Sequence, residues 1–249
     1  MMEQSLAGKV VLITGGARRV GAAISERLHA AGASVALHYR KSADEAVALR
    51  GRLEDRRAGS AIALQADLID VAALPRLVES TLARFGRLDV LINNASTFYP
   101  TPLGEITPEA WDDLFGTNLR APLFLSQAAA PALRESRGLV LNIADIHGQR
   151  PLRHHPVYSS AKAGLIMLTQ SLAREMAPHV RVNAIAPGPV LFPEHGVTEE
   201  MKESIVERTL LKRIGSPEDI ARAALFFTAE APYVTGQILA VDGGRSANT

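Results

Sequence analysis

The sequence predicts an α/β protein of the Rossmann type, with one doubly wound parallel sheet and helices on both of its faces. Short apolar, β-branched runs alternate with longer segments of helical periodicity along the chain. Most of these runs are apolar at nearly every position, as expected for strands that are covered on both faces. A glycine-rich turn, GGARRVG, follows the first run and opens the first helical segment, which is typical of such sheets.

Seven segments are predicted to be strands: Lys9–Thr14, Ser34–Tyr39, Ala61–Ala66, Leu88–Asn94, Gly138–Ala144, Val180–Ala186 and Gly236–Asp242. Helical patterns lie between them, as in VGAAISERLHAAG, which Gly32 is placed to end. Because strands that alternate with helices build βαβ units, we expect the strands to be parallel.

Residues 1–249 contain no linker and no shift in composition, so we expect a single domain. One stretch, residues 189–211, departs from the alternation of strands and helices. It begins rich in proline and continues as an amphipathic segment. We interpret it as a lid or substrate loop.

Composition excludes several classes of protein. The hydrophobic content of 47% and charged content of 21% are typical of soluble globular proteins, and a net charge of +1 predicts no nucleic-acid or membrane partner. The absence of cysteine excludes disulfides and thiolate chemistry. We find neither the apolar run of a signal peptide nor one of about 18 residues that would span a membrane. A soluble cytoplasmic protein is therefore expected.

The glycine-rich turn is a candidate phosphate-binding loop. Gly15, Gly16 and Gly21 permit a tight turn and let a pyrophosphate approach the N-terminus of the following helix. A glycine-rich turn that binds no ligand is the alternative. The strand and the helix on either side of the turn favour the dinucleotide site.

The end of the second predicted strand, HYRKS, indicates which dinucleotide is bound. A site for unphosphorylated ribose usually has an acid there, and this segment has none. Arg40, Lys41 and Ser42 instead offer cationic and hydroxyl donors that suit a 2′-phosphate, and Arg19 adds another. We therefore predict NADPH rather than NADH. Ordinary exposed charges at a strand end are the alternative.

Two further segments are placed to contact the same cofactor. Asp67, after the third strand, is positioned to hydrogen-bond an adenine amino group, although a helix N-cap is a strong alternative. The small residues of Asn93–Ser96, after the fourth strand, let the backbone approach a bound cofactor.

Together these segments resemble the short-chain dehydrogenase/reductase family. The matching stretches, in the family's order, are TGGARRVG, ADL, NNAS, TNLRAP with Asn118, YSSAK with Tyr158 and Lys162, APGPV and VDGG. The resemblance implies a seven-stranded parallel sheet of order 3-2-1-4-5-6-7 and a homotetramer. The cofactor contacts that it implies, together with those inferred above, are Gly15, Arg19, Val20, His38, Tyr39, Arg40, Lys41, Ser42, Asp67, Leu68, Asn94, Ala95, Ser96, Tyr158, Lys162, Pro187 and Gly188.

Within this family the sequence is most similar to the pteridine reductases. TGGARRVG carries Arg19 where most members have a glycine, HYRKSADEA matches the end of the second strand, and NNASTFYPTPLGEIT extends beyond the general pattern. The resemblance implies that Ser96 and Phe98 touch a pterin or the cofactor, with the Phe98 ring stacked on a flat heterocycle. A buried loop anchor is the alternative for Phe98. The implied substrate contacts are Arg19, Ser96, Phe98, Asp145 and Tyr158.

Tyr158 and Lys162 are candidate catalytic residues. Four positions apart, they share one face of a helix. A nearby ammonium favours the phenolate, so we expect Lys162 to lower the pKa of Tyr158 from its usual value of about 10 and to make it a usable acid. The resemblance also implies that Lys162 binds the nicotinamide ribose and that Asn118 supports a proton relay through it. For the isolated pattern, a solvated helix face is the alternative.

Asp145 precedes Tyr158 by 13 positions, where many related enzymes have a serine. A serine hydroxyl donates a hydrogen bond to a carbonyl oxygen, whereas a carboxylate donates none unless protonated and repels an alkoxide. A carboxylate suits a substrate whose ring nitrogen must gain a proton. Asp145 is therefore expected to hold Tyr158 and to help deliver that proton. An N-cap for the following turn is the alternative.

The predicted reaction is hydride transfer from NADPH to a pterin C=N bond, with a dihydropterin, and also dihydrofolate, as small-molecule substrates. One alternative is a carbonyl reductase of the same family, acting on a 3-oxoacyl carrier, a sugar or a ketone. Another is an NADPH-binding regulatory protein without catalysis. The adjacent His154 and His155 lack the spacing of a zinc pair, so no metal site is predicted, and we place them at the mouth of the site.

Overall fold

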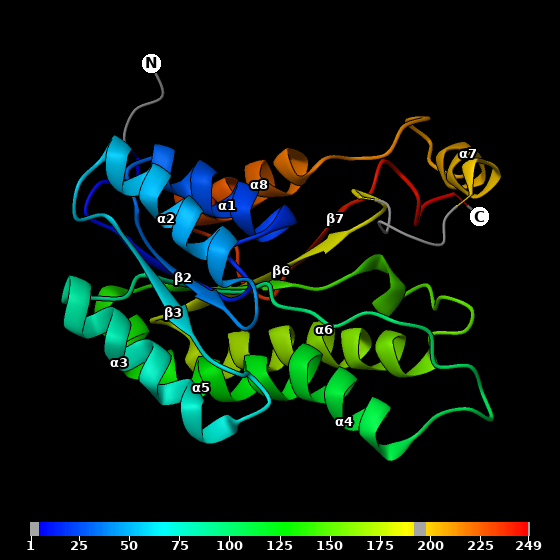
Figure 1. The fold of residues 1–249 in the computed structure, drawn as a ribbon, viewed down its shortest axis with the longest axis horizontal. Helices are drawn as coiled ribbons and strands as arrows, with labels where there is room; N and C mark the ends of the chain where they lie inside the picture. The colour runs from blue at the N-terminus through cyan, green and yellow to red at the C-terminus, as the bar shows by residue number, and fades with distance from the viewer. Residues whose placement is uncertain (1–4, 192–197, 249) are drawn as a thin grey trace.

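Seven parallel strands form one sheet in the computed structural model, which describes residues 5–191 and 198–248 (Figure 1). The strand order is β3-β2-β1-β4-β5-β6-β7, which confirms the order implied by the family resemblance. The ends of six strands differ from the predicted ends by one or two residues. The strands are β1 Val10–Ile13, β2 Ser34–Tyr39, β3 Ala61–Gln65, β4 Val90–Asn93, β5 Leu139–Ile143, β6 Arg181–Pro187 and β7 Ile238–Val241.

Two layers of helices enclose the sheet, as the apolar strands predict (Figure 1). One face is covered by α1 Arg19–Ala30, α2 Ala43–Arg56 and α8 Pro217–Leu225. The other face is covered by α3 Leu74–Phe85, α4 Pro108–Phe115, α5 Ala121–Ser136 and α6 Pro156–Met176. Among the described residues, no helix is both long and apolar enough to cross a membrane.

Alternate side chains of one strand enter opposite halves of the core. Val11 and Ile13 of β1 pack with Leu28 of α1 in one buried cluster. Leu12, between them, packs with Leu125 of α5 in the other. This is the two-residue period of a strand with apolar layers on both sides, and it explains why the strands are apolar throughout.

Local sequence signals set several helix ends. Ser216 and Asp219 form a reciprocal capping box at the start of α8. The first helix ends at Ala30, and Gly32 follows with φ +108, so the predicted stop at this glycine is confirmed. An added Cβ at Gly32 would meet the backbone of Ala7, so close packing as well as backbone geometry requires a glycine there.

The segment 189–211, interpreted from the sequence as a lid or substrate loop, contains a helix, α7 Glu199–Glu207. Thr198 caps α7 by accepting a hydrogen bond from Met201 N, and the amphipathic pattern corresponds to this helix. None of the helix residues is fully buried, and α7 lies beside the C-terminus at one end of the molecule (Figure 1). Residues 192–197 of the predicted loop lie outside the described residues.

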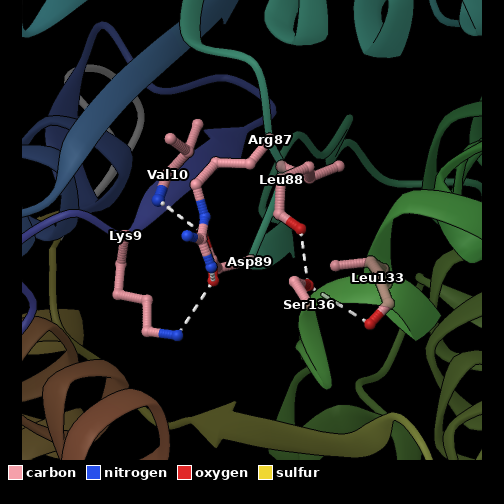
Figure 2. A network of polar contacts seen from close by, with 7 residues as sticks. All are labelled: Lys9, Val10, Arg87, Leu88, Asp89, Leu133 and Ser136. Atoms are coloured by element: carbon pink, nitrogen blue, oxygen red, sulfur yellow. Dashed lines mark hydrogen bonds and ion pairs between the residues drawn. The ribbon is translucent and has the colours of Figure 1, made fainter.

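A network of polar contacts fastens β1 to β4 at the amino edge of the sheet (Figure 2). The buried carboxylate of Asp89 accepts hydrogen bonds from Val10 N at 3.0 Å, Lys9 Nζ at 3.0 Å and two nitrogens of Arg87. Beside it, Ser136 Oγ donates to the carbonyl oxygen of Leu88 at 2.7 Å. Burial alone raises the pKa of Asp89, but the hydrogen bonds from Arg87, Val10 and Lys9 outweigh it and lower that pKa. Asp89 is therefore ionised and fully partnered.

Asp89→Ala should destabilise the fold, because it leaves Val10 N without its acceptor and removes the anion that Arg87 and Lys9 contact. We expect the free energy of unfolding to fall by about 2–4 kcal/mol. Urea unfolding followed by circular dichroism measures this loss. Asp112→Ala, at an exposed acid on α4, is the control and should change stability by less than about 0.5 kcal/mol. An Asp89→Ala protein as stable as the control would contradict this account of the edge.

Candidate active site

The carboxyl ends of the strands converge on one edge of the sheet, and the predicted site residues gather there. Gly15 follows β1, Asn94 follows β4, Asp145 follows β5 and Gly188 follows β6. In parallel α/β sheets this edge is where ligands bind. The topology thus assembles a site from segments that are far apart in the sequence.

Asp145 uses its two carboxylate oxygens for different partners. Oδ2 accepts a hydrogen bond from the Tyr158 hydroxyl at 2.7 Å. Oδ1 accepts one from His147 N at 2.8 Å and so caps the short 3₁₀ turn Ile146–Gly148. Asp145 therefore both caps the following turn and accepts the hydrogen bond of Tyr158, and the cap fixes the orientation of its carboxylate.

The pKa of Tyr158 lies well above its usual value, so the expectation of a lowered pKa was wrong for this structure. Burial is the largest cause, followed by the charge of Asp145 and its hydrogen bond, while Ser96 acts weakly in the opposite direction. Lys162 Nζ donates to the carbonyl oxygen of Ile143 at 2.9 Å, and it lies 5.7 Å from the centre of the Tyr158 ring. Burial lowers the pKa of Lys162 itself to about 8. Tyr158 is therefore protonated in this structure.

Asn118 lies in a π-helical turn, Gly116–Arg120, between α4 and α5. Its Nδ2 donates to the carbonyl oxygens of Leu114 at 2.9 Å and Thr97 at 3.0 Å. Its Oδ1 accepts a hydrogen bond from Ser96 Oγ at 2.7 Å. These hydrogen bonds close the widened turn and hold the Asn118 side chain in one orientation beside the site. π turns are frequent at functional sites.

Hydrogen bonds of Thr14 and Asn94 stabilise the candidate phosphate-binding loop. Thr14 Oγ1 accepts hydrogen bonds from the backbone N–H groups of Asn94 and Ala95. Asn94 Nδ2 donates to the carbonyl oxygens of Thr14 and Gly15. Asn94 and Ala95 therefore shape the loop, and sequence reasoning missed Thr14, whose only signal was its place directly before the glycines.

His38 braces the same loop from the second strand. Its Nδ1 accepts a hydrogen bond from Gly15 N at 3.1 Å, and its Nε2 donates to the carbonyl oxygen of Ala66 at 3.1 Å. One nitrogen accepts and the other donates, so the ring must be neutral. Burial lowers its pKa to about 4, which agrees. The His38 ring thus links the loop after β1 to the segment after β3.

The cationic end of β2 is exposed, as a site for a 2′-phosphate requires. Arg40 and Lys41 are both exposed, and Arg40 Nη1 lies 3.9 Å from Asp67 Oδ1. Ser42 is the N-cap residue of α2, but its side chain makes no capping hydrogen bond. Asp67 Oδ1 accepts a hydrogen bond from Ile69 N, so Asp67 closes a local turn, and the neighbouring Asp70 caps the next 3₁₀ turn.

The other predicted cofactor residues differ in how exposed they are. Arg19 is exposed and has φ +50, a conformation that favours glycine, which explains why family members usually have one here. Leu68 is buried in the core, whereas Tyr39 and Val20 are partly buried, so the Leu68 side chain is closed to a ligand. Pro187 ends β6, and a Cβ on the next residue, Gly188, would collide with Asp242.

Aromatic rings form the wall of the site next to Tyr158. Phe98 is 47% exposed, so the alternative of a buried anchor is wrong. Its ring stacks on His155 with centroids 4.7 Å apart and meets Tyr158 edge to face at 4.8 Å. From the sequence, His155 was expected only at the mouth of the site. Its contact with Phe98 was missed because no sequence pattern relates residues 98 and 155.

The residues at this edge fit a dinucleotide cofactor. A Cβ on Gly21 would strike the Gly15 carbonyl oxygen, so the loop keeps its close turn only with glycine. The glycine turn leads directly into the N-terminus of α1, and backbone N–H groups at a helix N-terminus suit a phosphate. Among the described residues, no group of three or more His, Cys, Asp or Glu side chains forms a metal site.

Comparison with known proteins gives matches over nearly the whole chain. A family model described as enoyl-(acyl carrier protein) reductase matches residues 15–246. Pteridine reductase 1 of Leishmania tarentolae is 37% identical over 288 residues, covering 98% of this chain and 99% of that protein. The 3-oxoacyl-acyl-carrier-protein reductase FabG of Staphylococcus aureus is 33% identical over 240 residues, covering 95% of this chain and 97% of that protein.

A solved structure is similar to the same extent. The crystal structure of a blue fluorescent protein from a metagenomic library, in complex with NADPH, matches with a TM-score of 0.91 and 35% identity. The match covers 97% of this chain and 99% of that chain. The relatives named for pterin and for 3-oxoacyl reduction are similar to this chain to nearly the same degree, so overall identity does not select a substrate.

Acid should destabilise the protein by protonating His38. Because the pKa of His38 is about 4 in the folded chain and 6.5 when unperturbed, the unfolded chain takes up this proton more readily. The stability contributed by neutral His38 is fully present above pH 6.5 and is lost as the pH falls toward 4. The loss is at most about 1.4 kcal/mol per pH unit. Urea unfolding at a series of pH values in this range measures it.

His38→Gln should reduce this pH dependence. His29 has a pKa of about 4 for the same reason of burial, so part of the slope remains in the variant. His179→Gln, at an exposed histidine, is the control and should keep the slope of the unmodified protein. If His38→Gln and the control gave the same slope, His38 would not be a neutral brace.

Proposed function

The chain belongs to the short-chain dehydrogenase/reductase family of oxidoreductases, and we propose that it is an NADPH-dependent reductase of a pterin C=N bond. The observation that carries the proposal is the hydrogen bond of 2.7 Å between Tyr158 and Asp145. A carboxylate next to the proton donor suits a nitrogen that must be protonated and opposes a developing alkoxide. Dihydropterins are the proposed substrates, with dihydrofolate as a further one.

NADPH would supply the hydride. The protein would bind and orient the cofactor and exclude competing reactions. The glycine turn and the N-terminus of α1 are suited to the pyrophosphate, and the exposed Arg40 and Lys41 are suited to the 2′-phosphate. Ser42 offers a hydroxyl that is not used for capping. Lys162 is buried beside Tyr158, and its proposed role is to bind the ribose hydroxyls.

Tyr158 is the proposed proton donor to the ring nitrogen. Its raised pKa keeps the proton in place until an acceptor arrives, and the carboxylate of Asp145 fixes the direction of the hydroxyl. A protonated Lys162 nearby stabilises the phenolate that forms on transfer. Asn118 holds the adjoining turn, and its role in returning the proton through Lys162 is part of the proposal.

The flat shape of a pterin agrees with the aromatic wall. Phe98 presents an exposed ring next to Tyr158, where it can stack on a heterocycle. Ser96 is exposed on the same loop and Arg19 lies at the start of α1, both proposed to contact the substrate.

The second candidate is a carbonyl reductase. The similarity to the Staphylococcus aureus 3-oxoacyl-acyl-carrier-protein reductase, at 33% identity, favours it. The carboxylate at Asp145 opposes it, because carbonyl reduction develops negative charge on oxygen next to that position. Overall similarity supports both candidates, whereas the local chemistry supports the first.

A substrate panel distinguishes them. We expect NADPH oxidation, followed by its absorbance, with dihydrobiopterin or dihydrofolate and little with a 3-oxoacyl thioester or simple ketones. Tyr158→Phe removes the proton donor and should lower kcat on the pterin by about 10²–10⁴-fold. Binding of NADPH, measured by its fluorescence, should persist in this variant. Turnover of ketones alone, or full activity of Tyr158→Phe, would refute the proposal.

We also propose a cytoplasmic homotetramer. Large apolar side chains are exposed on the helices of one layer, with Trp111 on α4 at 47%, Leu123 on α5 at 37% and Met167 on α6 at 61%. Apolar side chains exposed in this way favour contact with other copies. Light scattering tests the assembly, for which four copies of 26.6 kDa are expected.

A further inference from the structure

The stack of His155 on Phe98 is not explained by the proposed reaction. The two rings are nearly parallel, with an interplanar angle of 12° and centroids 4.7 Å apart. His155 lies directly before α6, three residues ahead of Tyr158, whereas Phe98 comes from the loop after β4. The stack therefore joins the aromatic wall to the helix that carries the proton donor.

The backbone around the stack holds both rings in place. Thr101 N donates a hydrogen bond to the carbonyl oxygen of His154 at 2.6 Å, which ties the loop of Phe98 to the segment before α6. His154 has φ +64, a strained conformation for a residue other than glycine. His155 Nδ1 donates to the carbonyl oxygen of Arg153 at 2.8 Å, which fixes the imidazole plane. Such a built arrangement is more than a chance contact between two exposed rings.

The side chain of His155 has no other structural task among the described residues. His155 is the N-cap residue of α6, but its side chain makes no capping hydrogen bond, and the helix starts with Pro156. Its backbone carbonyl accepts from Ser159 N, an interaction that any residue would keep. Removing the imidazole therefore removes the stack and the bond to Arg153 while leaving the helix start intact.

We propose that His155 is a positioning residue that supports the Phe98 ring from behind, so that the opposite face of Phe98 is presented to a flat heterocyclic substrate beside Tyr158. This inference rests on the proposed pterin reduction. His155 sets the plane of Phe98, and Phe98 sets the distance between the substrate ring and the Tyr158 hydroxyl. Flat substrates gain from this support, because stacking requires a fixed ring plane.

Steady-state kinetics with dihydrobiopterin provides the first test. His155→Ala should raise the KM for the pterin about two- to tenfold, the loss expected for one aromatic pair, with kcat changed less than about twofold. The KM for NADPH should not change. His155→Phe, which keeps a ring able to stack, should restore the KM of the unmodified enzyme. His179→Ala is the control for the same chemical change at an exposed position.

The outcomes separate this inference from the function on which it rests. An unmodified enzyme that reduces pterins, together with a His155→Ala variant of unchanged KM, would overturn the role of His155 alone. A His155→Phe variant as impaired as His155→Ala would also overturn that role. An enzyme that turns over no pterin would overturn both the role of His155 and the proposed function.

Proton NMR of the ligand-free protein tests the stack without any turnover. The ring protons of His155, assigned by their loss in His155→Phe, should be shifted upfield by the Phe98 ring. Phe98→Leu should move them downfield and leave the His179 resonances unchanged. His155 resonances at the positions of a free histidine in the unmodified protein would exclude the stack and, with it, the proposed support.

Discussion

The hydrogen bond between Tyr158 and Asp145 is the constraint on which the rest of the site depends. It joins the end of β5 to α6 and fixes the direction of the Tyr158 hydroxyl, which donates to the carboxylate of Asp145. The second carboxylate oxygen caps the turn Ile146–Gly148, so the carboxylate has little freedom to rotate. Burial and the charge of the Asp145 carboxylate together raise the pKa of Tyr158 and keep its hydroxyl protonated.

Buried hydrogen bonds behind the site help to hold Asp145 and Tyr158 at hydrogen-bonding distance. Asn93 Nδ2 donates to Asn142 Oδ1 at 2.8 Å, and Asn142 Nδ2 donates to Thr169 Oγ1 at 2.9 Å. These residues lie on β4, β5 and α6, the elements that carry Phe98's loop, Asp145 and Tyr158. A satisfied buried network of this kind favours one relative placement of its elements. The catalytic geometry is therefore supported by the interior of the fold as well as by the exposed loops.

The strands and the glycine turn were predictable, because apolar runs and glycine positions carry direct physical signals. The strand order followed only from the family resemblance, since apolar runs do not say which strands are neighbours. Asp145 and Tyr158 were predictable as partners from the family resemblance and from the chemistry of a carboxylate that can accept a phenol hydrogen bond. The raised pKa of Tyr158 was not predictable, since it depends on the depth of burial and on the charge and hydrogen bond of Asp145. The pairing of Phe98 with His155 was not predictable either, because no local pattern indicates contact between residues that are far apart in the sequence.

Replacing Asp145 by serine, the residue common in related enzymes, tests the central claim most directly. The measurement is kcat/KM of Asp145→Ser for dihydrobiopterin and for a 3-oxoacyl thioester, with NADPH binding measured in parallel. The account predicts a loss of about 100-fold or more on the pterin, unchanged NADPH binding and equal or better reduction of the carbonyl substrate. Undiminished pterin reduction by Asp145→Ser would show that the carboxylate does not determine the chemistry of this site.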